Sequence, residues 1–387
     1  MLIGIDGNEA NVEKRVGIGE YAFELLKQFY NFQFSIFNFQ FLVYLKDKPR
    51  GDLPKEKENW QYKVFGPKKF WTQIGLPFDL YFHKPRPDVF FSPTHYAPRF
   101  SPVPTVISIM DLSYIHFPEM FKKSDLYQLR NWTAYSVRNA KRVLTISQAS
   151  KDDIIKEYRV PEDKVVVTYP GIKKESRIMN QESGINRIRK KYSIDGNYVL
   201  FVGTLQPRKN IVRLIQAYSL VCHPELVSGS QSKRDSDLRQ NDTQLVIVGK
   251  KGWLYEEILE APKKFGIEDR VKFLDFVSDE DLTLFYQNAL CFVLPSLYEG
   301  FGLPVLEAMQ YGCPVITSNV SSLPEAGGDA ALYIDPLNVD DIALKIKMII
   351  EDKKLRDNLI EKGKKQAARF SWEKTARETL KVLESIK

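Results

Sequence analysis

The sequence is poor in the residues that build covalent or metal-bound frameworks, with three cysteines and four histidines among 387 residues. Cys222, Cys291 and Cys313 show no CxxC spacing, so neither a disulfide framework nor a zinc site is indicated, and a reducing setting is expected. The histidines are His83, His95, His116 and His223. Because they show no metal-binding spacing and no legible Ser-His-Asp order, we expect no metal site.

Long apolar runs are also absent. No stretch is apolar for eighteen residues, and residues 1–10, MLIGIDGNEA, show no basic segment before an apolar core. We therefore expect a cytoplasmic protein that neither spans a membrane nor is secreted through a signal peptide of this type. Zinc-finger and RRM signatures are missing too, which argues against a nucleic-acid partner.

The composition is that of a soluble globular protein, with 43% hydrophobic and 27% charged residues. The formal charge is +7 and the pI is about 9.0, which favours anionic partners without distinguishing nucleic acid, phospholipid or a phosphorylated small molecule. The same basic balance would let the protein visit an anionic membrane surface. The oligomeric state is not encoded in any pattern that we recognise.

Short apolar, β-branched runs alternate with helix-period segments along the whole chain, which is typical of parallel sheets covered by helices on both faces. The predicted strands are 2–6, 41–45, 88–91, 105–110, 142–147 and 164–169 in the first half, and 198–204, 244–250, 271–276, 291–296, 314–318 and 331–335 in the second. The pattern predicts an α/β protein of two doubly wound, Rossmann-like domains that face each other across a cleft.

Polar and Pro-Gly segments indicate the domain limits. A strand ends in Pro-Gly within 170–183, which predicts an N-terminal domain over 1–172 and a C-terminal domain over 173–371. The last segment, 372–387, follows a serine and has helical spacing, so we expect a final helix that returns to the first domain. A polar stretch near 223–242 is expected to be a surface insertion, to which we assign no chemistry.

The most informative stretch is 296-SLYEGFGLPVLEAM-309, where a strand ends just before Glu299 and a helix begins near Pro304. Gly300 and Gly302 allow a sharp turn and a close approach to a ligand. Glu307 would lie about one turn into the helix, where the helix dipole alone favours a carboxylate. Read in isolation, this stretch leaves two alternatives open: a functional carboxylate pair, or a solvated loop residue followed by a helix-start glutamate.

Other predicted strand ends also carry polar residues or glycines. Arg208 and Lys209 follow strand 198–204, where two cations beside helix N-terminal amides predict a phosphate or diphosphate site, with a solvated basic turn as the alternative. Gly17 and Gly19 precede a helix and could hold phosphate through backbone N–H groups, with a simple tight turn as the alternative because the spacing is not GxGxxG. Asp111 follows strand 105–110 and is placed to accept a hydrogen bond in the cleft.

Together these motifs resemble the family 4 retaining glycosyltransferases, which have the GT-B fold. The most specific element is the E-x7-E motif, Glu299 to Glu307. Segments in the order and spacing of that family support it over nearly the whole chain: 142-RVLTISQASKDDI-154, 202-VGTLQPRKN-210, 309-MQYGCPVITS-318 and 324-PEAGGDAALYIDP-336.

The resemblance implies a retaining, metal-independent transfer of a hexose, of mannose or glucose type, from a GDP-, UDP- or ADP-sugar to a glycan or lipid-linked acceptor. The nucleotide-sugar is a substrate, so no cofactor is implied. By this resemblance, Lys209 and Arg208 would neutralise the departing diphosphate. Glu299 would lie near the donor hexose, and Glu307 would accept hydrogen bonds from the ribose hydroxyls. The resemblance also implies donor contacts from the residues Gly17, Gly19, Gly203, Thr204, Gly300, Phe301, Gly302 and Leu303.

Two positions depart from the family pattern. Thr204 stands where many members have an arginine, so either Arg208 supplies that contact or the contact is missing. Met110 stands where many members have a histidine, so any acceptor-orienting role passes to Asp111 or is lost. Two alternatives stay open. One is a sugar-nucleotide epimerase or phosphorylase on a similar two-domain scaffold. The other, which Met110 and the polar insertion favour, is a non-catalytic homologue that binds a nucleotide-sugar or a partner.

Overall fold

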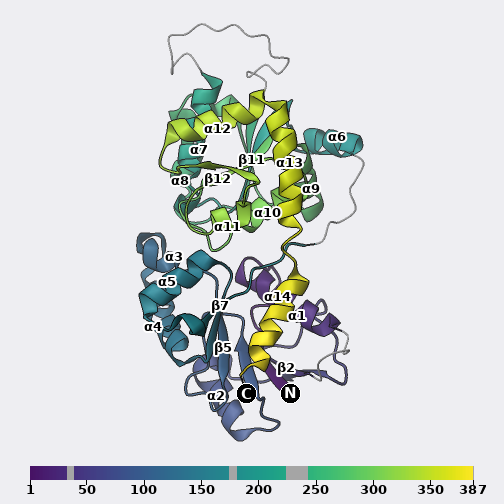
Figure 1. Cartoon of the computed structure of the whole chain (residues 1–387), viewed down its shortest axis with the longest axis vertical. Coiled ribbons are helices and arrows are strands. Elements are labelled where there is room, and N and C mark those ends of the chain that lie inside the picture. Colours follow the sequence, from purple (N-terminus) through teal and green to yellow (C-terminus); the bar gives the residue numbers. More distant parts are fainter. Residues whose placement is uncertain (33–38, 174–180, 224–242, 387) are drawn as a thin grey trace. The chain divides into compact units, whose positions relative to one another are not determined.

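The structure is a computed structural model that describes residues 1–32, 39–173, 181–223 and 243–386. The predicted polar insertion, apart from His223, therefore lies outside the described residues. The chain divides into two compact units (Figure 1), which are unit 1, Met1–Gly171 with Phe370–Lys387, and unit 2, Ile172–Arg369. Each unit is described by itself below.

Unit 1 is built on a seven-stranded sheet with the strand order β3-β2-β1-β4-β5-β6-β7, in which every neighbouring pair is parallel. Its strands are β1 (Leu2–Asp6), β2 (Gln40–Leu45), β3 (Trp60–Val64), β4 (Val89–Ser92), β5 (Thr105–Ile109), β6 (Arg142–Thr145) and β7 (Val165–Val167). The helical segments are α1 (Ile18–Asn31), η1 (Trp71–Gly75), α2 (Leu76–Phe82), α3 (Ser113–His116), η2 (Pro118–Met120), α4 (Lys123–Asn139), α5 (Gln148–Tyr158), η3 (Glu162–Lys164) and α14 (Trp372–Glu384).

Unit 2 is built on a six-stranded parallel sheet with the order β10-β9-β8-β11-β12-β13. Its strands are β8 (Asn197–Val202), β9 (Thr243–Val248), β10 (Val271–Leu274), β11 (Cys291–Leu294), β12 (Val315–Ser318) and β13 (Ala331–Ile334). The helical segments are α6 (Gln181–Tyr192), η4 (Pro207–Lys209), α7 (Ile211–Cys222), α8 (Glu256–Lys264), η7 (Glu268–Arg270), α9 (Asp279–Asn288), α10 (Leu303–Gln310), α11 (Leu323–Gly327), α12 (Val339–Glu351) and α13 (Lys353–Ala367).

The prediction of two doubly wound α/β domains is confirmed. Each predicted strand is present, and the central ones are buried on both faces, as the continuous apolar runs indicated. The additional strand, β3, forms the edge of its sheet. Only its first residue, Trp60, is buried, and polar Gln61 and Lys63 interrupt the strand, so a search for apolar runs misses it. In the described ranges, no helix has both the length and the apolar character that a bilayer span requires.

The strand orders place a switch point in each sheet. In unit 1 the chain order reverses between β1 and β4, and in unit 2 it reverses between β8 and β11. Open parallel sheets bind ligands beyond the carboxyl ends of the strands at such points. The residues that follow these four strands are therefore the first candidates for a site.

The C-terminal helix α14 belongs to unit 1. The Ser371 side chain caps it by accepting a hydrogen bond from the Lys374 N–H at 3.2 Å. Trp372 packs edge-on against Tyr21 of α1, with 5.9 Å between ring centroids, and the Thr375 hydroxyl donates to the Tyr169 carbonyl at 2.6 Å. The cap and these contacts hold α14 against unit 1.

Candidate functional site

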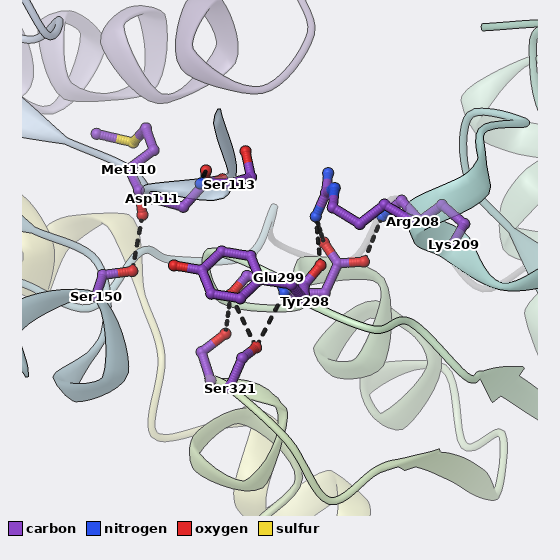
Figure 2. Close-up of polar contacts among 10 residues, drawn as sticks. Met110, Asp111, Ser113, Ser150, Arg208, Lys209, Tyr298, Glu299 and Ser321 are labelled. Carbon is purple, nitrogen blue, oxygen red and sulfur yellow. Dashed lines mark hydrogen bonds and ion pairs between the residues drawn. The ribbon is translucent and has the colours of Figure 1, made fainter. Parts of the chain in front are cut away.

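A cluster of two cations and one carboxylate lies at the switch point of unit 2. The chain after β8 reaches Arg208 and Lys209 in η4, and the chain after β11 reaches Glu299. Figure 2 shows the three side chains meeting, with Lys209 Nζ at 2.6 Å from Glu299 Oε1 and Arg208 Nη1 at 3.3 Å from Glu299 Oε2. The parallel pairing of β8 with β11 brings these two strand ends together, as a site at the switch point requires.

The cluster is buried. Glu299 is 8% exposed and Lys209 is 9% exposed, so the alternatives of a solvated loop and a solvated basic turn are wrong for these two residues. Burial by itself raises the pKa of Glu299, but Lys209 and then Arg208 outweigh burial and lower that pKa to about 2. The Glu299 carboxylate is therefore ionised at neutral pH and cannot act there as a proton donor.

The backbone around Glu299 is fixed by residues that the sequence did not single out. The Glu299 N–H donates to Ser321 Oγ at 2.9 Å, and the Ser322 hydroxyl donates to the Glu299 carbonyl at 2.8 Å. The Arg208 guanidinium also donates to the Tyr298 carbonyl. The two serines follow β12, the strand beside β11, and this position at a neighbouring strand end was the signal that could have identified them.

The glycine-rich loop after Glu299 leads directly into α10. Gly302 precedes the helix with φ of 100°, and a Cβ there would lie 2.8 Å from the Leu323 side chain, so both the backbone conformation and the space require glycine. Gly300 and Phe301 are buried, whereas Leu303 is partly exposed. The N-terminal amides of α10 therefore follow immediately after the charged cluster, which is a suitable arrangement for an anion.

Glu307 lies on α10 and makes a separate contact. Its Oε2 accepts a hydrogen bond at 3.2 Å from the hydroxyl of Tyr286, a buried residue of α9. Burial first, and the Glu307 carboxylate second, raise the pKa of Tyr286 well above its ordinary value, so the phenol stays a donor. Tyr286 thus orients Glu307, and no local motif around Tyr286 indicated this role.

The turn after β8 begins at Gly203 and packs against Gly249, which follows β9. The Gly203 N–H donates to the Val248 carbonyl at 2.9 Å, and a Cβ on Gly249 would lie 1.9 Å from the Gly203 carbonyl oxygen. Gly249 therefore lets the ends of β8 and β9 approach closely, and it was not among the predicted residues. Thr204, the next residue of the turn, is exposed.

The predicted residues of unit 1 follow other strand ends. Gly17 precedes α1 with φ of 52° and is exposed, and Gly19 is buried in the first turn of that helix. Asp111 Oδ1 accepts from the Ser113 N–H at 2.8 Å, while the Met110 carbonyl accepts from the Ser150 hydroxyl at 3.1 Å (Figure 2). The contacts of Gly17 and Gly19 with a diphosphate stay a prediction.

His95 is a further candidate near Asp111. Burial lowers the pKa of His95, and the Asp111 carboxylate opposes that effect. The His95 Nδ1 is buried without a hydrogen-bond partner among the described residues. His95 follows β4 and Asp111 follows β5, and these two strands pair in parallel. The fold therefore supplies an imidazole near Met110, the position at which many family members have a histidine.

A cavity of about 340 Å³ opens at the switch point of unit 1. Its walls include Asp6 at the end of β1, Lys46 after β2, Tyr96 after β4 and Trp132 from α4. The Asp6 carboxylate is buried, which raises its pKa, and it accepts a hydrogen bond from Asn8 Nδ2 at 2.6 Å. Charged groups beside aromatic rings suit a polar ligand with an apolar face, such as a sugar. Across the described parts of the chain, no three His, Cys, Asp or Glu side chains gather as a metal site would require.

Comparisons with known proteins bear on both units. The family model described as Glycosyltransferase Family 4 matches residues 42–176, and the model described as Glycosyl transferases group 1 matches residues 184–366. The chain is 34% identical over 276 residues to the O-antigen chain mannosyltransferase B of Escherichia coli, covering 71% of this chain and 68% of that protein. It is 30% identical to the serotype-specific mannosyltransferase WbdA of the same species, covering 61% of this chain and 28% of that protein.

A solved structure supports the fold. HepE of Anabaena, in complex with UDP and glucose, superposes with a TM-score of 0.72 over 99% of each chain, at 20% sequence identity. At that identity the likeness concerns the fold alone. With two Rossmann-like units, two family models that match them, and a relative at 34% identity, the chain belongs to glycosyltransferase family 4 and is a glycosyltransferase with the GT-B fold.

Proposed function

We propose that the protein transfers a hexose, of mannose or glucose type, from a nucleotide-diphosphate sugar to a glycan or lipid-linked acceptor, with retention of configuration and without a metal. The observation that carries this proposal is the buried cluster of Lys209, Arg208 and Glu299 beside the N-terminus of α10. The names of the mannosyltransferase relatives support the choice of hexose, and the UDP and glucose bound to HepE support the donor class.

The two cations would act on the leaving group. Cleavage of the bond between the anomeric carbon and the phosphate oxygen builds negative charge on the diphosphate, which Lys209 and Arg208 would stabilise. The amides of residues 300–303 would add donors from the helix start. Glu307, held by Tyr286, would accept hydrogen bonds from the ribose hydroxyls.

Glu299 would act on the other charge of the transition state. As the bond breaks, positive charge develops on the sugar, and an ionised carboxylate with a pKa of about 2 stabilises it electrostatically. Because this carboxylate carries no proton at neutral pH, the acceptor hydroxyl would give its proton to the departing phosphate oxygen. The new bond from the acceptor oxygen to the anomeric carbon would then form on the face that the phosphate leaves, which retains the configuration.

Unit 1 would hold the acceptor. The cavity with Asp6, Lys46 and Trp132 offers hydrogen-bonding groups and an aromatic surface for a sugar ring. Asp111 is placed beyond β5 to accept a hydrogen bond from a hydroxyl, and His95 lies close enough to Asp111 for their charges to interact. These assignments replace the histidine that the family pattern has at the position of Met110.

The test combines binding with turnover. Thermal-shift measurements against GDP-, UDP- and ADP-sugars should single out one base, because ligand stabilisation grows with the ratio of ligand to Kd. With that donor, release of nucleoside diphosphate should depend on an added mannose- or glucose-terminated glycan, and NMR of the product should show the donor's anomeric configuration. Sugar epimerisation without an acceptor, or phosphate-dependent release of sugar phosphate, would instead identify the alternative enzymes. Failure of the folded chain to bind or consume any donor would overturn the proposal.

A further inference from the structure

The segment from Lys68 to Arg86 in unit 1 exposes an unusual group of large apolar side chains. These are Phe70 at 53%, Ile74 at 61%, Phe78 at 56%, Tyr81 at 46% and Phe82 at 71% exposure. They lie on or beside η1 and α2, and Figure 1 draws α2 at the end of unit 1 that carries the chain termini. Large apolar side chains that are exposed together on one segment, unlike single ones scattered over a surface, indicate an interaction site.

The helical segment is apolar on two opposite sides. On its inner side Trp71, Leu76 and Leu80 are buried against strands of the sheet, in a cluster that includes Tyr44 and Phe90. The outer stripe consists of Ile74 and, at i+4, i+7 and i+8, the residues Phe78, Tyr81 and Phe82. This spacing places the four side chains on one helical face. A helix that is apolar all round is normally covered on every side, so the outer stripe needs a partner.

The outer stripe itself is an aromatic patch. The rings of Phe78 and Phe82 have centroids 4.7 Å apart, and those of Tyr81 and Phe82 are 6.2 Å apart. Phe and Tyr rings of this kind are suited to the boundary between lipid headgroups and acyl chains. We call the surface formed by Phe70, Ile74, Phe78, Tyr81 and Phe82 the η1–α2 face.

The exposed charges that this segment itself carries are positive. Within residues 66–86 the basic residues besides His83 are Lys68, Lys69, Lys84 and Arg86, and all four are exposed. The only carboxylate in that range, Asp79, is buried and lies 2.7 Å from Lys63 Nζ and 3.1 Å from His83 Nδ1. Lys68 pairs with Asp47 outside the segment. The face therefore combines apolar rings with a rim of cations.

We propose that the η1–α2 face docks on the surface of an anionic lipid bilayer, with its aromatic rings in the headgroup region and its cations on lipid phosphates. The combination of aromatic stripe and basic rim is that of an interfacial membrane helix. If a fully exposed side chain has an area of about 200 Å², the exposed fractions of the five side chains add up to roughly 500–600 Å². A standard protein interface buries roughly 800 Å² on each partner, so this face is small for a protein partner.

The same segment also forms one wall of the cavity in unit 1. Residues 68–73 line that cavity together with Asp6, Glu9 and Lys46. Docking would thus hold the cavity wall at the membrane surface, where the sugar of a lipid-linked acceptor is presented. The docking does not depend on the proposed function, whereas the delivery of a lipid-linked acceptor does.

The experiment is co-sedimentation of the full chain with vesicles, without any nucleotide-sugar. Binding should be at least roughly tenfold tighter to vesicles of phosphatidylcholine with phosphatidylglycerol than to phosphatidylcholine alone, and added salt should weaken it. The double substitution Phe78→Ser with Phe82→Ser should weaken binding by at least tenfold, and so should Lys84→Glu with Arg86→Glu. The matched control is Phe276→Ser in unit 2, a phenylalanine at 69% exposure whose substitution should leave binding unchanged.

A second measurement separates docking from misfolding and from catalysis. The Phe78→Ser and Phe82→Ser variant should keep the wild-type melting temperature, because both rings are exposed, and should turn over a soluble acceptor at the wild-type rate. Absence of sedimentation with anionic vesicles, or equal sedimentation of wild type and double variants, would overturn the proposal. Size-exclusion chromatography showing a dimer that the phenylalanine variant abolishes, without vesicle binding, would assign the face to a second copy of the chain instead.

Discussion

Replacing Glu299 with glutamine tests whether its charge holds the two cations in place. Glutamine keeps the shape of the side chain but removes the negative charge, which leaves buried Lys209 and nearby Arg208 without their carboxylate. The pKa of Glu299 falls from 4.5 to about 2 in the folded chain, and at 1.36 kcal/mol for each pKa unit its ionised form stabilises the fold by roughly 3 kcal/mol. Breaking a buried ion pair costs about 3–5 kcal/mol, which agrees with that figure.

The loss should depend on pH in a defined direction. Because folding lowers the pKa of Glu299, its contribution is fully present above about pH 4.5 and is lost as the pH falls from about 4.5 to about 2. Differential scanning calorimetry at pH 7 should show the transition of unit 2 lowered by about 6–12 °C in Glu299→Gln, for a unit of this size. The difference from wild type should shrink as the pH falls below 4.5.

A matched substitution in the same unit is Glu361→Gln. Glu361 forms an exposed ion pair with Lys365, so its loss should leave the melting temperature of unit 2 unchanged. Equal melting temperatures for wild type and Glu299→Gln at pH 7 would refute the reasoning. A loss of the same size at every pH from 7 to 3 would refute it too, because the effect would then not come from the charge.

Three further substitutions address other parts of the site. Lys209→Met should lower kcat with the preferred nucleotide-sugar about 100-fold in steady-state assays, because the leaving diphosphate loses a buried cation. Tyr286→Phe removes the 3.2 Å hydrogen bond to Glu307 and should raise the KM for the donor roughly tenfold, with kcat changed much less. Gly249→Ala would place a Cβ 1.9 Å from the Gly203 carbonyl oxygen and should lower the free energy of unfolding of unit 2 by roughly 3 kcal/mol in denaturant titrations.

Each of these results has a contrary outcome. Unchanged turnover in Lys209→Met would remove this lysine from the proposed mechanism, and an unchanged KM in Tyr286→Phe would show that Glu307 does not need its partner. For the glycine, Gly51→Ala in unit 1 is the control. No atom lies within 4 Å of a Cβ built there, so unit 2 should keep its wild-type free energy of unfolding in that variant. If Gly249→Ala were as stable as Gly51→Ala, the close approach of the β8 and β9 ends would not be required.

The sequence alone determined which segments form the two sheets, except for strand β3. Runs such as Cys291–Leu294 are apolar throughout, so they are buried on both faces wherever they lie in a sheet. Helix starts were also legible, because Ser371 and Pro304 act on the backbone within one turn of their own positions. The edge strand β3 was missed because Gln61 and Lys63 interrupt it and leave no continuous apolar run.

The sequence also pointed to the strand ends that carry the charged cluster, but not to its geometry. Glu299 and Lys209 are 90 positions apart, and their contact at 2.6 Å depends on the pairing of β8 with β11. Likewise, Tyr286 and Ser321 reach the site only because α9 and the end of β12 pack beside it. A local pattern shows that a segment is buried, whereas its neighbours are chosen by long-range packing.

The sequence also did not show which apolar residues of α2 are exposed. In sequence, Phe78 and Phe82 are indistinguishable from Leu76 and Leu80, and all four fit an ordinary core helix. The tertiary structure decides that Leu76 and Leu80 pack on the sheet and that Phe78 and Phe82 are exposed. The helix has two apolar sides, and only one of them can face the sheet. Composition and periodicity therefore determined the fold and the candidate strand ends, and packing decided which side chains meet at the site and which are left for a partner.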